Sequence, residues 1–269
     1  MGLLIVAGGS MVTSLESMKS SGETISHPLH RPTASITAIT VDNLPVLSSD
    51  KIVNLPILLY HDTPPNFESQ LKHIRDKGYS TITFAQATAG WHNITPLPAK
   101  PVIITFDDGF ADQIDAFNLL KKYSMYATFY IINGSAKSRW CIGASRRYND
   151  PLQPPAGCGN TYLHWDEIQM MDKSGLITIG GHTMDHANLP TLSSADQLKE
   201  IVDSKMGIET KLGHSITDFA YPYGLFDDTT IAAVHQAGYV TAVTTMSGTL
   251  QHPANAYTLH RVRDALILP

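Results

Sequence analysis

Four short polar motifs follow apolar segments of the chain and carry side chains suited to acid–base or metal chemistry. They are His61-Asp62 after PILLY, Asp107-Asp108-Gly109 after VIITF, His182 with His186 after TIGG, and Pro222-Tyr223-Gly224 after DFAY. A carboxylate with two imidazoles is a common ligand set for a catalytic divalent metal that keeps one position open for water. The metal lowers the pKa of that water, and a second carboxylate can accept its proton. The motifs therefore indicate metal-assisted hydrolysis.

In two of these motifs, the spacing of the residues allows some side chains to bind a metal and another to act as a base. His182 and His186 are four positions apart, which lets both imidazoles reach one ion across a single turn. Asp107 and Asp108 are adjacent, so in extended backbone their side chains diverge, and one can bind metal while the other serves as a base. Taken singly, a pair of aspartates, two spaced histidines or a YPYG turn is common. Their shared position after predicted strands makes the combination informative.

Strands and helices alternate from about Asn54 onward and would bring the motifs together. The sequence predicts strands at 56–60, 80–83, 102–106, 128–132, 176–179, 219–221 and 239–243. It predicts helices over 112–123, 165–174, 194–212 and 227–237, and an earlier one that begins near Phe67 and closes at Gly78. This alternation predicts an α/β fold with a mostly parallel sheet, open or closed into a barrel. In such folds the carboxyl ends of the strands meet at one face, where active sites form.

The composition indicates which classes of binding partner are expected, and it separates an N-terminal arm from a folded domain. Hydrophobic residues make up 43% and charged residues 16% of the sequence, and the formal net charge is −5. The absence of a basic stripe argues against nucleic acid and favours a neutral or cationic glycan. Residues 1–50 are rich in Ser, Thr and Pro and predict a poorly structured arm or stalk, whereas 51–269 hold the domain. The short apolar run 3–7 lacks a preceding basic residue, and no transmembrane span is predicted.

The two cysteines lie in an irregular stretch. Cys141 and Cys158 fall within 135–163, which interrupts the alternation and is interpreted as an inserted surface loop near a site. In an exported protein they are expected to form one disulfide, worth about 3 kcal/mol by the chain-entropy relation. The alternative is a pair of free thiols in a cytosolic enzyme.

The motifs resemble those of a known family. TFDDG at 105–109, HTMDH at 182–186 and YPYG at 221–224 resemble the motifs of the polysaccharide deacetylases, carbohydrate esterase family four. The LLYHD segment and the FAYPYG form resemble the branch that contains the biofilm poly-N-acetylglucosamine deacetylases. The resemblance covers about residues 55–263. It implies a distorted (β/α) barrel of about seven mostly parallel strands and one divalent metal, most often Zn²⁺, with Co²⁺ or Ni²⁺ as alternatives.

The resemblance also implies roles for individual residues. Asp107 matches the general base, and the implied metal ligands are Asp108, His182 and His186. His61 resembles a displaced counterpart of the family's catalytic histidine and is expected to act as the general acid. Tyr223 is expected to stabilise the oxyanion through its backbone N–H, and Pro222 and Tyr223 are expected to contact substrate.

One position departs from the family pattern. Many members carry an arginine two residues before the Pro-Tyr pair, where this chain has Ala220. That arginine orients the base, so its charge must come from elsewhere in this chain. Arg261 and Arg263, near the C-terminus, are the candidates.

The expected activity is removal of N-acetyl groups from N-acetylglucosamine units of an extracellular or cell-wall polysaccharide. The expected location is secreted, periplasmic or cell-surface, with a polysaccharide or oligosaccharide as the partner. Two alternatives stay open. An O-acetyl esterase acting on a xylan-type polymer would use the same residues, and a non-catalytic glycan-binding module would lack a ligand or the base, all of which are present here.

Overall fold

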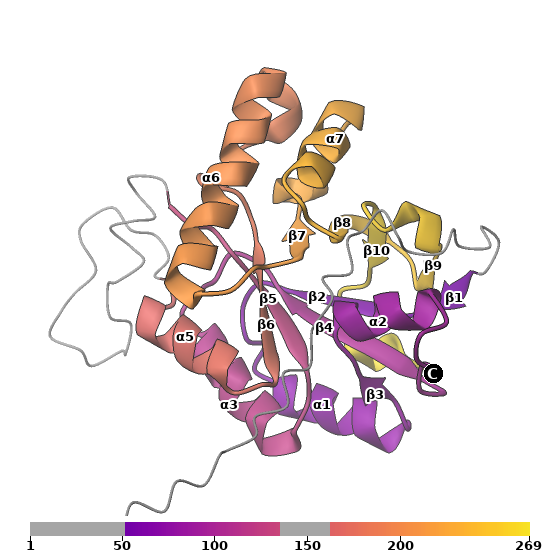
Figure 1. Cartoon of the computed structure of the whole chain (residues 1–269). Helices are drawn as coiled ribbons and strands as arrows, with labels where there is room; N and C mark the ends of the chain where they lie inside the picture. The colour runs from indigo at the N-terminus through magenta and orange to yellow at the C-terminus, as the bar shows by residue number, and fades with distance from the viewer. Residues whose placement is uncertain (1–51, 135–161) are drawn as a thin grey trace, which may run out of the picture. The chain divides into compact units, whose positions relative to one another are not determined.

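The computed structural model describes residues 52–134 and 162–269 (Figure 1). The predicted arm at 1–50 and the predicted disulfide between Cys141 and Cys158 lie outside the described residues. Within the described residues, no helix is both long and apolar enough to cross a membrane.

Seven parallel strands form a nearly closed barrel. Their order is β2 (Ile57–Tyr60), β4 (Pro101–Phe106), β5 (Ala127–Ile131), β6 (Ile177–Gly181), β7 (Asp218–Ala220), β8 (Thr241–Ser247) and β10 (Leu259–Arg261). The first and last strands meet just beyond β10, where Val262 donates its N–H to Ile57 O and accepts from Leu59 N–H, both at 2.8 Å. The predicted distorted (β/α) barrel of about seven strands is thereby confirmed.

Three short strands lie outside this ring. β3 (Ser80–Thr81) pairs with the first residues of β4, and β1 (Val53–Asn54) pairs antiparallel with β9 (Leu250–Gln251). Strands β1, β9 and β10, of two or three residues each, were not predicted.

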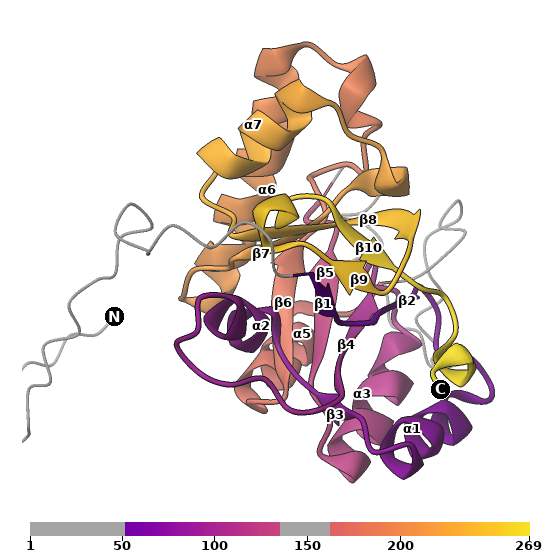
Figure 2. The ribbon, with the colours of Figure 1, turned by 90° about the vertical axis from the view of Figure 1, so that its right-hand side faces the viewer.

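Helices cover the outside of the barrel, and one lies apart from the others. The helices are α1 (Phe67–Asp76), α2 (Phe84–Trp91), α3 (Gln113–Tyr123), α5 (Trp165–Lys173), α6 (Ser194–Leu212) and α7 (Asp228–Gln236). The 3₁₀ turns are η2 (Leu189–Thr191), η3 (Pro222–Gly224), η4 (Pro253–Asn255) and η5 (Ala265–Ile267). In Figure 1, α1, α3 and α5 lie on one side of the strands, and α6 and α7 lie together on another. In Figure 2, α2 lies in front of β6, whereas α5 lies behind that strand.

The alternation of strand side chains builds two apolar layers. In β4, Val102 and Ile104 belong to the layer between the strands and the outer helices, whereas Ile103 belongs to the second layer inside the barrel. The inner layer also contains Phe84 and Trp91 of α2, so this helix closes the amino ends of the strands. Helix α2 was not predicted, because its sequence, FAQATAGW, has no clear polar face. The polar motif residues lie at the opposite end of the barrel, where the strands have their carboxyl ends.

Candidate metal and acid–base site

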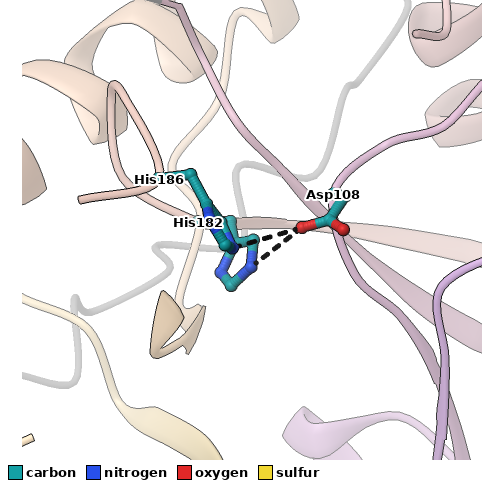
Figure 3. A group of neighbouring side chains, drawn as sticks. All are labelled: Asp108, His182 and His186. Atoms are coloured by element: carbon teal, nitrogen blue, oxygen red, sulfur yellow. Dashed lines mark ion pairs between the residues drawn. The ribbon is translucent and has the colours of Figure 1, made fainter. Parts of the chain in front are cut away.

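A carboxylate and two imidazoles meet at the carboxyl ends of β4 and β6 (Figure 3). Asp108 Oδ1 lies 3.3 Å from His182 Nε2 and 3.4 Å from His186 Nε2. One ligand atom from each of these residues lies within 4.8 Å of the others. The structure therefore brings together the three residues that the sequence suggested as metal ligands.

The chemistry of this cluster fits a cation. His182 Nδ1 lies 2.7 Å from Ala220 O and must donate its proton there, because a carbonyl oxygen only accepts. When His182 is neutral, its bare Nε2 lone pair faces Asp108 Oδ1, which is buried and has no other hydrogen-bond donor among the described residues. Burial would lower the pKa of His182, but its contact with Asp108 raises it, whereas burial, followed by the charge of His182, lowers the pKa of His186 to about 4. A divalent cation among the three atoms would meet one carboxylate oxygen and two imidazole nitrogens, which is a common donor set for such an ion.

Strained backbone shapes the cluster, and it corrects two expectations about how the motifs work. Asp108 has a φ of 71°, so it is left-handed and not extended, and this turn separates its side chain from that of Asp107. His182 and His186 are linked by an irregular loop and not by a helical turn, with Thr183 at φ 63° and His186 at φ 54°. With Tyr223 at φ 60°, the site holds four of the six non-glycine residues of positive φ in the described ranges. Such strain collects where surrounding structure imposes it for function.

Helix α6 holds the loop between the two histidines. One carboxylate oxygen of Glu200 accepts the backbone N–H of Met184 at 3.1 Å and of Asp185 at 3.0 Å. On the other side of the loop, Asn133 donates its backbone N–H to Thr183 O at 3.1 Å. Sequence analysis missed Glu200, because no neighbouring residue on the helix indicates which loop it contacts.

Asp107 sits beside the cluster and is paired with a buried arginine. Arg261 donates Nη1–H to Oδ1 and Nη2–H to Oδ2 of Asp107, both at 2.7 Å, and both residues are 2% exposed. A third bond, from Arg261 Nε to Thr244 O at 2.7 Å, fixes the guanidinium. Burial alone would raise the pKa of Asp107, but the charge and hydrogen bonds of Arg261 hold that pKa below its usual range. Of the two candidate arginines, Arg261 meets the carboxylate, and Arg263 is exposed.

The remaining predicted residues border the same site. His61 follows β2, and its charge contributes to lowering the pKa of both Asp107 and Asp108, which places it within electrostatic reach of them. The Tyr223 ring meets the His186 ring edge to face, with centroids 4.5 Å apart, and is 59% exposed, whereas Pro222 is buried. All four motifs thus converge, and among their residues Tyr223 exposes a large aromatic side chain to solvent.

The sequence profile of the polysaccharide deacetylase family matches residues 95–242. The chain belongs to this family. The protein YxkH of Bacillus subtilis (strain 168), named for the same family, is 32% identical over 227 residues, which cover 81% of this chain and 74% of that protein. Membership makes a hydrolytic deacetylase the expected class of enzyme.

Two further relatives support this family, and the first carries the activity of the suggested branch in its name. The poly-beta-1,6-N-acetyl-D-glucosamine N-deacetylase of Staphylococcus aureus (strain MRSA252) is 26% identical over 190 residues, which cover 66% of this chain and 59% of that enzyme. The Streptococcus pyogenes deacetylase PplD, solved in complex with acetate, superimposes with a TM-score of 0.65 at 27% identity, and the match covers 79% of this chain and 93% of that chain. The resemblance that the motifs suggested is confirmed at the level of the family.

Proposed function

We propose that this protein is a divalent-metal-dependent hydrolase that removes N-acetyl groups from N-acetylglucosamine units of an extracellular or cell-wall polysaccharide. The observation that carries the proposal is the meeting of Asp108 with His182 and His186, directly beside an aspartate that Arg261 keeps ionised. The named activity of the Staphylococcus aureus relative supports an amide as the bond that is cleaved. A secreted, periplasmic or cell-surface location would bring the protein to such a substrate.

The three clustered side chains are the proposed holders of the metal, which we take to be Zn²⁺, with Co²⁺ or Ni²⁺ as alternatives. A bound metal of this kind polarises an acetyl carbonyl and lowers the pKa of a coordinated water. Asp107 is the proposed general base. Arg261 occupies one lone pair on each carboxylate oxygen of Asp107 and leaves others free to accept a proton.

His61 and Tyr223 are proposed to serve the leaving group and the oxyanion. An amine leaves a tetrahedral centre poorly unless its nitrogen is protonated, and His61 is the proposed donor of that proton. The backbone N–H of Tyr223 is the proposed donor to the carbonyl oxygen as negative charge develops on it. The products are acetate and a free amine on the sugar.

Acetate release tests the reaction directly. Zinc-loaded full-length protein should release acetate from β-1,4- or β-1,6-linked N-acetylglucosamine oligomers assayed side by side, which also identifies the linkage. Release from acetylated xylan alone would replace the proposal with an O-acetyl esterase. Binding of oligomers without any release would make the protein a glycan-binding module.

The role of His61 is tested by the choice of leaving group. An activated phenol leaves as its anion and needs no acid, so His61→Ala should cripple cleavage of the sugar amide and spare hydrolysis of an aryl acetate. Equal losses on both substrates, with the metal still bound, would assign His61 a structural role.

A further inference from the structure

Gln113, the first residue of α3, contacts the chain segments of both the proposed base and the proposed acid. Its Nε2 donates to Asp107 O and to His61 O, each at 2.6 Å. The side chain is fully buried, at 0% exposed. A single amide nitrogen therefore bridges two segments that lie far apart in sequence.

The position of Gln113 relative to the sheet explains why such a bridge is needed. Strands β2 and β4 pair in register as far as Tyr60 and Phe106, and one further bond joins Asp107 N–H to Tyr60 O at 2.9 Å. The left-handed turn at Asp108 then takes the second segment away from the strand direction. Gln113 binds the next carbonyl of each segment at the point where the regular pairing stops.

The orientation of this amide is determined by its partners. Both neighbours are carbonyl oxygens, which can only accept, so the NH₂ end must face them. The other end, Oε1, is buried without a hydrogen-bond partner in the described part of the chain. Leaving a buried acceptor unpaired costs free energy, and the two bonds made by Nε2 are the visible compensation.

A second contact ties the same loop to the start of α3. Thr63 donates its backbone N–H to Asp112 Oδ2 at 2.6 Å and its hydroxyl to Asp112 O at 2.7 Å. With the Gln113 bond to His61 O, three hydrogen bonds fasten residues 61–63 to residues 112–113. The bonds of the threonine hold the loop as a whole, whereas only Gln113 also touches the segment that carries Asp107.

We propose that Gln113 is a positioning residue that sets the main chain of the general base Asp107 and of the general acid His61 in one fixed relation. The inference rests on the proposed function, in which those two residues transfer protons to and from one acetyl amide. Gln113 touches no reacting atom, so its effect passes through the two carbonyls that it binds. Misplacement of catalytic groups by about 1 Å can cost on the order of 100-fold in rate.

The test compares two buried glutamines changed in the same way. Gln113→Met keeps the length of the side chain and removes both donors. Gln197→Met is the matched control, because Gln197 is 2% exposed and its partners are Leu192 O and the Thr230 hydroxyl. Both proteins are loaded with zinc, and their metal content, melting temperature, kcat and KM are measured with an N-acetylglucosamine oligomer and with an aryl acetate.

Gln113→Met should retain its metal and lose about 10-fold to 100-fold in kcat on the oligomer with KM little changed. The loss on the aryl acetate should be smaller, because that substrate needs no acid. Gln197→Met should lower the melting temperature without reducing kcat more on the oligomer than on the aryl acetate. Wild-type kcat in Gln113→Met, or equal losses on both substrates, would overturn the proposal.

A second readout separates this proposal from the proposed function. The imidazole ¹³Cε1 resonance of His61 in the NMR spectrum should move in Gln113→Met and stay in place in Gln197→Met, whether or not the wild-type protein releases acetate. An unmoved His61 resonance overturns the positioning role, whereas failure of the wild type on every oligomer overturns only the reaction. If Gln113→Met does not fold, Gln113→Asn is measured instead, because its amide is one methylene too short to reach both carbonyls.

Discussion

Two aspartates, Asp107 and Asp218, are equally buried at opposite ends of the barrel, and their pKa values are shifted in opposite directions. Each is 2% exposed. Asp107 follows the carboxyl end of β4 and meets the Arg261 guanidinium twice at 2.7 Å, and its pKa is held below the usual range. Asp218 opens β7 and accepts from the Thr241 hydroxyl at 2.7 Å, with no arginine beside it. Burial raises the pKa of Asp218 to about 6.

The difference shows that burial alone does not make a site. A buried carboxylate bound by hydroxyls, with only the weaker charge effect of Lys205, resists ionisation. A carboxylate that meets a bidentate guanidinium stays charged and available as a base. The backbone conformation also differs between the two ends of the barrel, because non-glycine residues with positive φ gather around Asp107 at the carboxyl end. Four substitutions test this contrast and the geometry around the proposed metal site.

The largest expected effect is on the reaction itself. Asp107→Asn should keep the bound metal and lose about 100-fold to 10,000-fold in the rate of acetate release, because the amide cannot accept the proton. Asp218→Asn is the control and should retain activity. Rates and metal content are measured on the same zinc-loaded samples. Parallel loss of metal in Asp107→Asn would mean that the two adjacent aspartates have exchanged roles.

Removal of the cation should convert Asp107 into an unpaired buried charge. Arg261→Met should lower the free energy of unfolding at neutral pH by about 3–5 kcal/mol, the usual cost of breaking a buried ion pair from one side. Urea denaturation measures this loss. Adding Asp107→Asn should restore most of the stability, since no charge then remains unpaired. A double variant no more stable than Arg261→Met would show that the arginine acts mainly through packing.

Asp218→Asn should stabilise the protein, and only at higher pH. Because the folded pKa of Asp218 is raised to about 6, the carboxyl is neutral in both states at low pH and costs stability once the unfolded chain ionises above about pH 4. The expected gain in unfolding free energy is about 2–3 kcal/mol near pH 8 and close to zero near pH 4, from roughly two pKa units. Denaturation at both pH values checks this. A gain that does not change with pH would exclude ionisation as its cause.

The smallest expected effect concerns the loop that presents His186. Glu200→Gln should lower zinc affinity about tenfold, because a neutral amide oxygen accepts the two backbone N–H groups of that loop more weakly than the charged carboxylate oxygen does. Glu209→Gln is the matched control, because Glu209 also lies on α6 and accepts a backbone N–H, that of Ile216, away from the metal ligands. His182→Ala sets the upper limit and should lose the metal and the activity together. Calorimetric zinc titration compares the variants, and equal affinity in both glutamate variants would contradict the role of Glu200.

Much of the secondary structure, and the convergence of the motif residues, could be predicted from the sequence. The helix predicted at 194–212 matches α6, because its apolar spacing, the Ser193 cap and Gly213 at φ 80° are all local signals. The convergence of Asp107, Asp108 and the histidines also followed, since parallel strands end at one face. The short strand β10 was not predicted, because its three residues, LHR, do not form an apolar run as the segment around β7 does.

The reactive residues, and the face of the barrel on which they meet, could be predicted from the motifs and the strand order. The arginine that contacts Asp107 could be identified only in the folded chain, because that contact joins residues 154 positions apart. The tertiary structure also shows that left-handed turns, and not extended or helical backbone, aim Asp108 and His186, and that Gln113 and Glu200 hold the segments around them. Strands and helices can be predicted because they depend on the spacing of apolar residues that are close in sequence. A hydrogen bond between distant segments forms only when the barrel closes, and no local sequence pattern indicates it.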